Sequence, residues 1–265
     1  MDIFKVFVRP PADPVMARDM PLISSPLPVT IILLCYLLFV LKFGKMFMEH
    51  RRPYNLKNIM LVYNFCQMIY NAILFYYGIY LIILKPVYDI RCIVILRDDH
   101  PMKGTERMVA YIYFLNKSLD LLDTIFFVLR KSYKQITFLH VYHHVMMAYS
   151  SYWVIHFYGC AGQFTVMGTL NTFVHTVMYF YYFISAMYPE LKGSLWWKKY
   201  ITKIQILQFV ILIIQSLAVL IFNPSCTFPI ILQYLQLFQA TVMIIMFVRF
   251  YIQSYVKPKQ KNHIK

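Results

Sequence analysis

Acidic residues are scarce in this chain: Asp and Glu together number 11 of 265 residues, against 26 Lys and Arg. Charged residues make up only 14% of the sequence, whereas hydrophobic residues make up 60%. This low charged fraction, combined with apolar runs that are long and numerous, excludes an ordinary soluble domain. The sequence also lacks an internal repeat and a low-complexity linker, so we expect a single domain.

Long apolar segments dominate the chain, and a membrane-spanning helix needs about 20 such residues in succession. Seven segments are long enough, and they lie at residues 28–48, 59–84, 107–130, 136–156, 164–187, 200–222 and 227–251. The N-terminal residues lack the charged, then apolar, then small-residue pattern of a cleavable signal peptide, so we expect none. The sequence therefore predicts an all-α membrane protein whose seven transmembrane helices form one domain, residues 1–265.

The distribution of positive charge predicts how these helices are oriented. Connections on one side of the predicted membrane carry 17 Lys and Arg residues against two acids, Glu49 and Glu190. On the other side, seven acids nearly balance eight Lys and Arg residues. Because cytosolic loops carry the excess of Lys and Arg, we expect a lumenal N-terminus and a cytosolic C-terminus. The net charge of +15 then suits anionic lipid headgroups and anionic substrates, and it requires no nucleic acid.

Three histidines interrupt the apolar fourth segment. His140, His143 and His144 are separated by three and four residues, so their rings lie on one face of a helix. Each polar ring at membrane depth must find a partner or serve a function. A lone histidine there would usually only hydrogen-bond between helices, but three on one face indicate a functional site.

The third segment carries ionisable side chains at a depth where each costs several kcal/mol unless it is paired or hydrated. Lys117 and Asp120 are three residues apart, and Asp123 and Thr124 follow one turn later. One interpretation is a buried ion pair that only locks two helices together, since such pairs can serve specificity alone. The other interpretation is a catalytic or binding site.

The fifth segment carries a stripe of polar and aromatic residues. Asn171, His175, Met178 and Tyr182 lie at offsets of 0, 4, 7 and 11, which places them on one helical face, with Tyr179 beside them. An aromatic stripe usually indicates packing. The Asn and His within this one make a lined cavity an equal alternative.

Polar residues of four segments are expected at one depth. Thr202, Gln205 and Gln208 descend from the cytosolic end of the sixth segment, and the fourth segment enters from the same side. Their polar groups therefore lie within the first three turns, under about 15 Å. The third and fifth segments run the other way, which places Asp120 and His175 in the middle or cytosolic half. We expect a polar pocket that opens to the cytosol.

Four motifs occur in order on these segments. They are Lys-x-x-Asp-x-x-Asp-Thr (Lys117 to Thr124), His-x-x-His-His (His140 to His144), Asn-x-x-x-His-x-x-Met-Tyr-x-Tyr-Tyr (Asn171 to Tyr182) and Thr-x-x-Gln-x-x-Gln-Phe (Thr202 to Phe209). Together they resemble the motifs of the ELO family of very-long-chain fatty acid elongases, and the resemblance covers essentially the whole chain. Asp120 occupies the position of the family's Glu, which keeps the charge on a shorter side chain.

The resemblance implies a membrane 3-oxoacyl-CoA synthase, which condenses a long-chain acyl-CoA with malonyl-CoA to give 3-oxoacyl-CoA, CO2 and free CoA. Both thioesters are substrates, and we expect neither a separate cofactor nor a metal. The third to sixth segments contain no Cys, so a neutral imidazole is the expected acyl carrier. His143 and His175 are the candidates for that role, while His140 and His144 would orient the reacting rings.

The other motif residues are expected to support this chemistry. Asp120 and Asp123 would fix ring tautomers, and Lys117 would balance their charge. A second His, Asn171 or Gln208 would donate a hydrogen bond to the enolate formed when malonyl-CoA loses CO2. The remaining candidate substrate-binding residues are Thr124, Tyr179, Tyr182, Thr202 and Gln205.

Three other functions fit parts of the pattern. A membrane di-iron desaturase also uses His-x-x-His-His, but it needs more ligands than four converging histidines can supply. A seven-helix receptor would share the topology without needing a layer of Lys, Asp and His. An inactive elongase homologue that only binds or scaffolds is disfavoured, because every motif position holds a reactive or near-identical residue.

Three cysteines are expected in lumenal connections, where the compartment is oxidising. Cys92, Cys160 and Cys226 allow three pairings. We predict that Cys92 pairs with Cys226 across the lumenal end of the bundle and that Cys160 stays free.

The family resemblance implies residence in the endoplasmic reticulum membrane. Expected partners are membrane lipid and the reductases and dehydratase of the elongation cycle, and a homo-oligomer is compatible with this picture. The chain ends in KPKQKNHIK, where His263 stands at the position of a lysine in a dilysine retrieval signal. We therefore expect weaker retrieval than a true dilysine would give.

Overall fold

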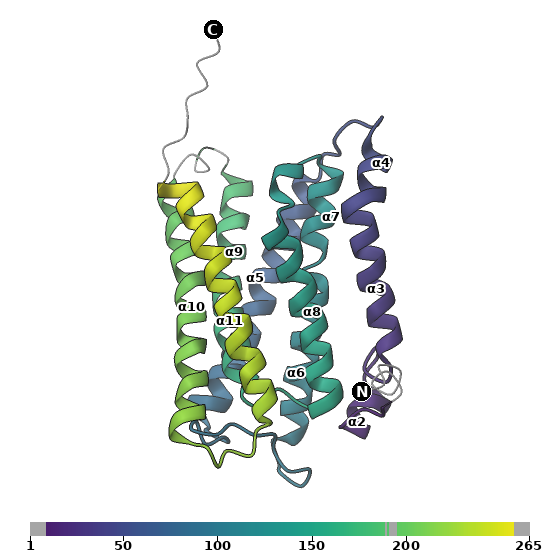
Figure 1. Cartoon of the computed structure of the whole chain (residues 1–265). Coiled ribbons are helices and arrows are strands. Elements are labelled where there is room, and N and C mark those ends of the chain that lie inside the picture. The colour runs from purple at the N-terminus through teal and green to yellow at the C-terminus, as the bar shows by residue number, and fades with distance from the viewer. Residues whose placement is uncertain (1–8, 189, 191–194, 257–265) are drawn as a thin grey trace.

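The structure is a computed structural model that describes residues 9–188, 190 and 195–256. The sequence KPKQKNHIK, in which a retrieval signal is predicted, and the charges of residues 1–8 lie outside these residues. Within them the chain is helical and contains no β-strand. Apolar helices of this kind, packed side by side along one axis, give the chain the character of a membrane protein (Figure 1).

Seven long helical segments correspond to the seven predicted ones. They are α3 (Pro26–Leu38) continued by η1 (Phe39–Phe43) and α4 (Gly44–Met48), α5 (Lys57–Ile79) continued by η2 (Tyr80–Leu84), α6 (Lys103–Leu119) with α7 (Leu122–Leu129), α8 (Phe138–Tyr158), α9 (Phe164–Met187), α10 (Leu195–Phe222), and α11 (Ile230–Tyr251) continued by η5 (Ile252–Val256). Two short helices, α2 (Pro14–Asp19) and η3 (Tyr133–Gln135), lie outside these segments.

Four of the segments are long and apolar enough to cross a membrane by length and composition. These are Pro26–Met48, Lys57–Leu84, Trp197–Phe222 and Ile230–Val256. The third segment is divided into helices of 17 and 8 residues, α6 and α7, each shorter than the roughly 20 residues that a membrane span needs. The α8 and α9 segments carry buried His residues, which lower their hydropathy. Membrane crossing by all seven segments, and the direction in which they cross, stay predictions.

The third predicted segment is not one continuous helix. It begins earlier than expected, at Lys103, and it breaks between Leu119 and Leu122. In the break, the N–H of Asp123 donates to the carbonyl of Asp120 (3.2 Å), which is the spacing of a tight 3-10 turn. The side chain of Asp120 is meanwhile held by groups on α5 and α9, so the turn follows from tertiary contacts that sequence periodicity does not report.

The helices pack in two groups, and a cavity lies between them. α5 packs along α9, α9 contacts α10, and α10 packs on α11, while α6 and α3 pack on α8. Gly78 permits the close approach of α5 to α9, because a Cβ at this position would collide with Thr169. The second group has its own buried core, which includes Tyr36, Phe114 and Tyr152.

A disulfide joins the connection before α6 to the turn before α11. Cys92 and Cys226 form this bond, which is the predicted pair, and Cys160 is free and buried. The bond closes a loop with a sequence separation of 134 residues. We expect Cys92→Ser or Cys226→Ser to lower the free energy of unfolding by about 2–4 kcal/mol, because the unfolded chain loses this constraint.

Thermal unfolding of the purified protein in detergent measures this loss. Cys35→Ser is the matched control, because Cys35 is an exposed free cysteine, and its effect should stay within about 0.5 kcal/mol. Equal melting temperatures for the wild type and Cys226→Ser would contradict a stabilising role for the bond.

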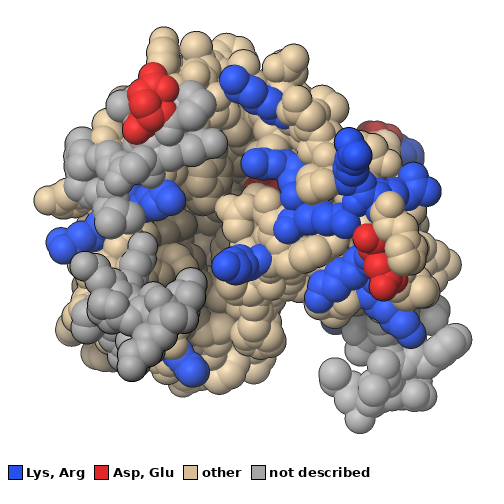
Figure 2. Space-filling model, turned by 90° about the horizontal axis from the view of Figure 1, so that it is seen from above, with Lys and Arg blue, Asp and Glu red and all other residues tan. Residues whose placement is uncertain are grey.

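Basic side chains gather at the end of the bundle where the described chain finishes. Figure 2 views this face, on which Lys and Arg outnumber Asp and Glu around a central hollow. Lys131, next to the end of α7, donates from Nζ to the carbonyl of Glu49, next to the end of α4 (3.1 Å). This is the face that the charge pattern predicts to be cytosolic.

Candidate active site

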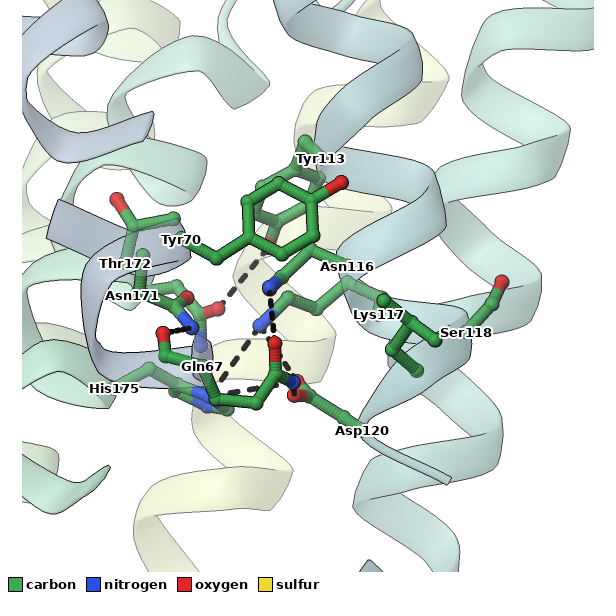
Figure 3. A network of polar contacts seen from close by, with 12 residues as sticks. Gln67, Tyr70, Tyr113, Asn116, Lys117, Ser118, Asp120, Asn171, Thr172 and His175 are labelled. Carbon is green, nitrogen blue, oxygen red and sulfur yellow. Dashed lines mark hydrogen bonds and ion pairs between the residues drawn. The ribbon is translucent and has the colours of Figure 1, made fainter. Parts of the chain in front are cut away.

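A buried ion pair lies at the end of α6. Lys117 is 1% exposed, and its Nζ is 2.8 Å from Oδ2 of Asp120. The same Nζ lies 3.4 Å from Nδ1 of His175 on α9, and that nitrogen is also 3.4 Å from Oδ2 of Asp120. The structure therefore brings together three of the predicted site residues, as Figure 3 shows. Each charge of the pair is compensated by its partner, as a buried charge requires.

Gln67 on α5 also hydrogen-bonds to Asp120. Its Nε2 donates to Oδ1 of Asp120 (2.6 Å), and its Oε1 accepts from Nδ2 of Asn116 (3.2 Å). The sequence analysis did not place Gln67 in the site, and its contact with Asp120 is seen in the structure. The spacing of Asn64, Gln67 and Asn71, three and seven residues apart, was the signal that α5 turns a polar stripe inward.

Tyr179 connects the two aspartates. Its hydroxyl lies 2.9 Å from Oδ1 of Asp120 and 2.7 Å from Oδ2 of Asp123. The hydroxyl of Tyr63, which also donates to the carbonyl of Leu119, lies 3.4 Å from that of Tyr179. Tyr179 is thus a hydrogen-bonded member of the site as well as a buried aromatic ring.

All four predicted histidines converge. The ring centroids of His140 and His144 are 4.3 Å apart, those of His143 and His144 are 5.6 Å apart, and those of His143 and His175 are 6.2 Å apart. Nε2 of His140 lies 2.9 Å from Oγ1 of Thr124, which fixes one ring of the cluster. Hydrogen bonds of this kind determine which nitrogen of an imidazole carries the proton.

An apolar cavity of about 1150 Å³ reaches this cluster. Of the four histidines, His143 is the one that lines it, and Asn171 and Gln208 line it as well. Oδ1 of Asn171 accepts from the hydroxyl of Tyr113 (3.2 Å), which orients the amide. Most of the remaining lining is aliphatic or aromatic, and residues of α5, α6, α8, α9, α10 and α11 all contribute to it.

Three predicted substrate-binding residues lie apart from the ion pair. Oγ1 of Thr202 donates to the carbonyl of Lys198 (3.0 Å), and Nε2 of Gln205 lies 3.9 Å from Sδ of Met178. Tyr182 is 40% exposed. Among the described residues, these three make no hydrogen bond to Lys117 or Asp120, and their roles in substrate binding stay predictions.

Glutamines of α11 form a part of the cavity wall that the sequence analysis did not include. The hydroxyl of Tyr142 donates to Oε1 of Gln239 (2.8 Å), and Nε2 of Gln236 donates to Oγ of Ser216 (3.1 Å). Gln236 and Gln239 both line the cavity. With Gln233, which is 1% exposed, they lie at steps of three along α11, with Gln236 buried and Gln239 half-buried, and this spacing was the signal in the sequence.

Within the described ranges, no group of three or more His, Cys, Asp or Glu side chains is arranged to hold a metal ion. The histidines instead contact one another, Thr124 and the Lys117–Asp120 pair. The expectation that the site uses no metal stays a prediction.

The fold and the site define a class: a helical membrane protein in which a histidine cluster reaches an apolar cavity and contacts a buried Lys–Asp pair. Comparison with known proteins gives the family. The ELO family, described as the GNS1/SUR4 family, matches residues 21–263, and the chain belongs to this family.

Several very long chain fatty acid elongases are similar to this chain over most of their length. The chain is 40% identical to very long chain fatty acid elongase F of Drosophila melanogaster over 252 residues, which cover 95% of this chain and 96% of the relative. It is 38% identical to very long chain fatty acid elongase 1 of Mus musculus, over 94% of this chain and 88% of the relative. The human elongase 1 is 35% identical over the same shares.

Proposed function

We propose that this protein condenses a long-chain acyl-CoA with malonyl-CoA to give 3-oxoacyl-CoA, CO2 and CoA, through an acyl group carried on a histidine. Membership of a fatty acid elongase family supports an enzyme of fatty acid elongation. The position of His143 carries the finer proposal. Its imidazole lies on the wall of an apolar cavity and 6.2 Å from the ring of His175.

Different parts of the acyl-CoA would bind to the cavity and to the histidine layer. An acyl chain in the cavity is surrounded by aliphatic and aromatic side chains, which favour burial of its methylene groups. Its thioester would then lie at the histidine layer, and the polyanionic CoA would extend toward the Lys and Arg residues of the face in Figure 2.

The first half-reaction transfers the acyl group to the enzyme. A ring nitrogen of His143 attacks the thioester carbonyl, an N–C bond forms, and the C–S bond breaks. The imidazole N–H proton passes to the CoA thiolate, so this half-reaction neither takes up nor releases a proton. His175, held by Lys117 and Asp120, is the alternative carrier, and it otherwise assists from its facing helix.

The second half-reaction uses malonyl-CoA. Loss of CO2 leaves an enolate, whose carbon attacks the acyl carbonyl, so that a C–C bond forms and the N–C bond breaks. The enolate oxygen needs hydrogen-bond donors, and the amides of Asn171 and Gln208 lie on the cavity wall to supply them. The departing imidazolate takes up one proton, which restores neutral histidine.

An acyl-enzyme predicts a definite kinetic pattern. Purified protein mixed with acyl-CoA alone should release CoA in a burst that is stoichiometric with enzyme, and steady-state kinetics should be ping-pong. The burst is measured by thiol titration after rapid mixing. If CoA appears only when malonyl-CoA is also bound, the acyl-histidine route is wrong even though the condensation itself stands.

The proposed reaction also indicates the cofactors, cellular location and partner proteins to expect. The two thioesters are the reactants, so the chemistry requires no further cofactor. We infer an endoplasmic reticulum location, because the oxidised Cys92–Cys226 pair fits a lumenal compartment and the basic face fits a cytosolic one. The 3-oxoacyl product must next be reduced, dehydrated and reduced again, so reductases and a dehydratase are the proposed partners, alongside membrane lipid and a second copy of this chain.

A further inference from the structure

The hydroxyl of Tyr179 contacts more acceptors than its single hydrogen can serve. It lies 2.9 Å from Oδ1 of Asp120 and 2.7 Å from Oδ2 of Asp123, both within hydrogen-bond distance. A phenol donates one hydrogen bond, whereas two ionised carboxylates only accept. One of the two carboxyl groups must therefore carry a hydrogen and donate it to the phenol oxygen.

The charges around the site identify Asp123 as the protonated carboxyl. Asp120 pairs with Lys117 (2.8 Å) and also accepts from Gln67 (2.6 Å), so its ionised form is stabilised from several sides. Asp123 has no comparable cation among the described residues, and the neighbouring Asp120 repels a second negative charge. With Asp123 neutral, Lys117 and Asp120 balance and the cluster carries no net charge.

These contacts form a continuous path for a proton. Asp123 is only half-buried, whereas Asp120 is 3% exposed. From Asp123 the path runs through the Tyr179 hydroxyl to Asp120, and then to Lys117 and Nδ1 of His175, each contact being 3.4 Å or less. The ring of His175 lies 6.2 Å from that of His143.

We propose that Asp123, Tyr179 and Asp120 are a relay that delivers the one proton consumed in each condensation cycle to the histidine layer. This inference rests on the proposed function, in which the second half-reaction takes up a proton and the first does not. In each transfer Asp123 gives its proton to the Tyr179 oxygen while the Tyr179 hydrogen moves to Asp120. Asp120 passes a proton on toward His175, and water then reprotonates Asp123.

Infrared spectroscopy tests the resting proton without any substrate. The difference spectrum between the wild type and Asp123→Asn should contain the C=O band of a protonated carboxyl group, and this band should shift in D2O. Asp98→Asn is the control, because the Asp98 side chain is 86% exposed and its removal should leave the band in place. A spectrum in which Asp123→Asn removes no such band would overturn the relay.

Kinetics of Tyr179→Phe test the transfer itself. The ring is kept and only the bridging hydroxyl is lost, so the CoA burst with acyl-CoA alone should stay within about twofold of the wild type. Turnover with malonyl-CoA should fall about a hundredfold, the usual size of a lost proton-transfer contribution. The solvent deuterium isotope effect on turnover should rise, because proton delivery becomes rate-limiting.

Tyr152→Phe is the matched control for this variant. Tyr152 is a buried tyrosine of α8 outside the four motifs, and its hydroxyl lies 3.1 Å from Nδ1 of His156. Tyr152→Phe should therefore keep both the burst and the turnover. If Tyr179→Phe loses the burst and the turnover equally, or keeps normal turnover, the relay is wrong.

The two proposals fail in different ways. Normal condensation by the wild type together with unchanged turnover in Tyr179→Phe would overturn the relay alone. A wild type that makes no 3-oxoacyl-CoA would overturn the proposed function and the delivery role with it. The infrared band would still decide which carboxyl group carries the proton.

Discussion

His143→Ala should lower the rate of condensation by about a thousandfold or more, because the covalent route depends on a nucleophile that alanine cannot supply. The fold should survive, since alanine favours helix and the ring lies on a cavity wall. Formation of 3-oxoacyl-CoA by purified protein measures the loss, and the CoA burst should disappear with it.

Two further variants sharpen this result. Ser150→Ala changes another cavity-lining residue of α8 and should leave the rate within about twofold. His175→Ala separates the two candidate carriers, because only the variant that lacks the carrier loses the burst. Near-normal rates in both histidine variants would rule out an acyl-histidine mechanism.

Lys117→Met should destabilise the protein by about 3–5 kcal/mol, because it leaves the carboxylate of Asp120 buried without its cation. The double variant Lys117→Met with Asp120→Leu removes both charges and should regain most of that stability, as buried pairs replaced by apolar residues often do. Neither variant should condense substrates. His175 loses its polar neighbour Lys117 in the single variant, and it loses both Lys117 and Asp120 in the double variant.

Thermal unfolding in detergent, carried out for both single variants and the double variant, gives the coupling free energy of the pair. A coupling near zero would mean that the 2.8 Å contact contributes little to stability. Full activity in the double variant would mean that the pair serves only to hold the helices.

Much of the site could be predicted from sequence, because its polar residues lie within long apolar segments, where an unpaired polar group costs free energy. His140, His143 and His144 stand out in an apolar run, and Lys117 with Asp120 stands out for the same reason. The seven helical segments followed from length and hydropathy. The expected compartment left three disulfide pairings, of which the predicted one, Cys92–Cys226, is formed.

Features that depend on which helices become neighbours could not be predicted in the same way. The break at Asp120 arises from contacts with α5 and α9, and helical periodicity continues through it unchanged. Gln67 and Gln239 resemble ordinary interhelical glutamines until the packing of α5 and α11 is known. The two hydrogen bonds of Tyr179 likewise require two carboxyl groups to meet at one hydroxyl, a geometry without a sequence signature.

The local nature of the Lys117–Asp120 pair has a consequence for the synthesis of the protein. Each such residue at the centre of a membrane helix costs about 2.5–3.5 kcal/mol on insertion, so a segment that carries both would enter the bilayer poorly on its own. The partners, however, are three residues apart in the chain, and one turn of helix brings them together. The charges can therefore neutralise each other as soon as α6 forms, before α9 is synthesised, so the predicted third span could enter the bilayer with this pair as a neutral unit.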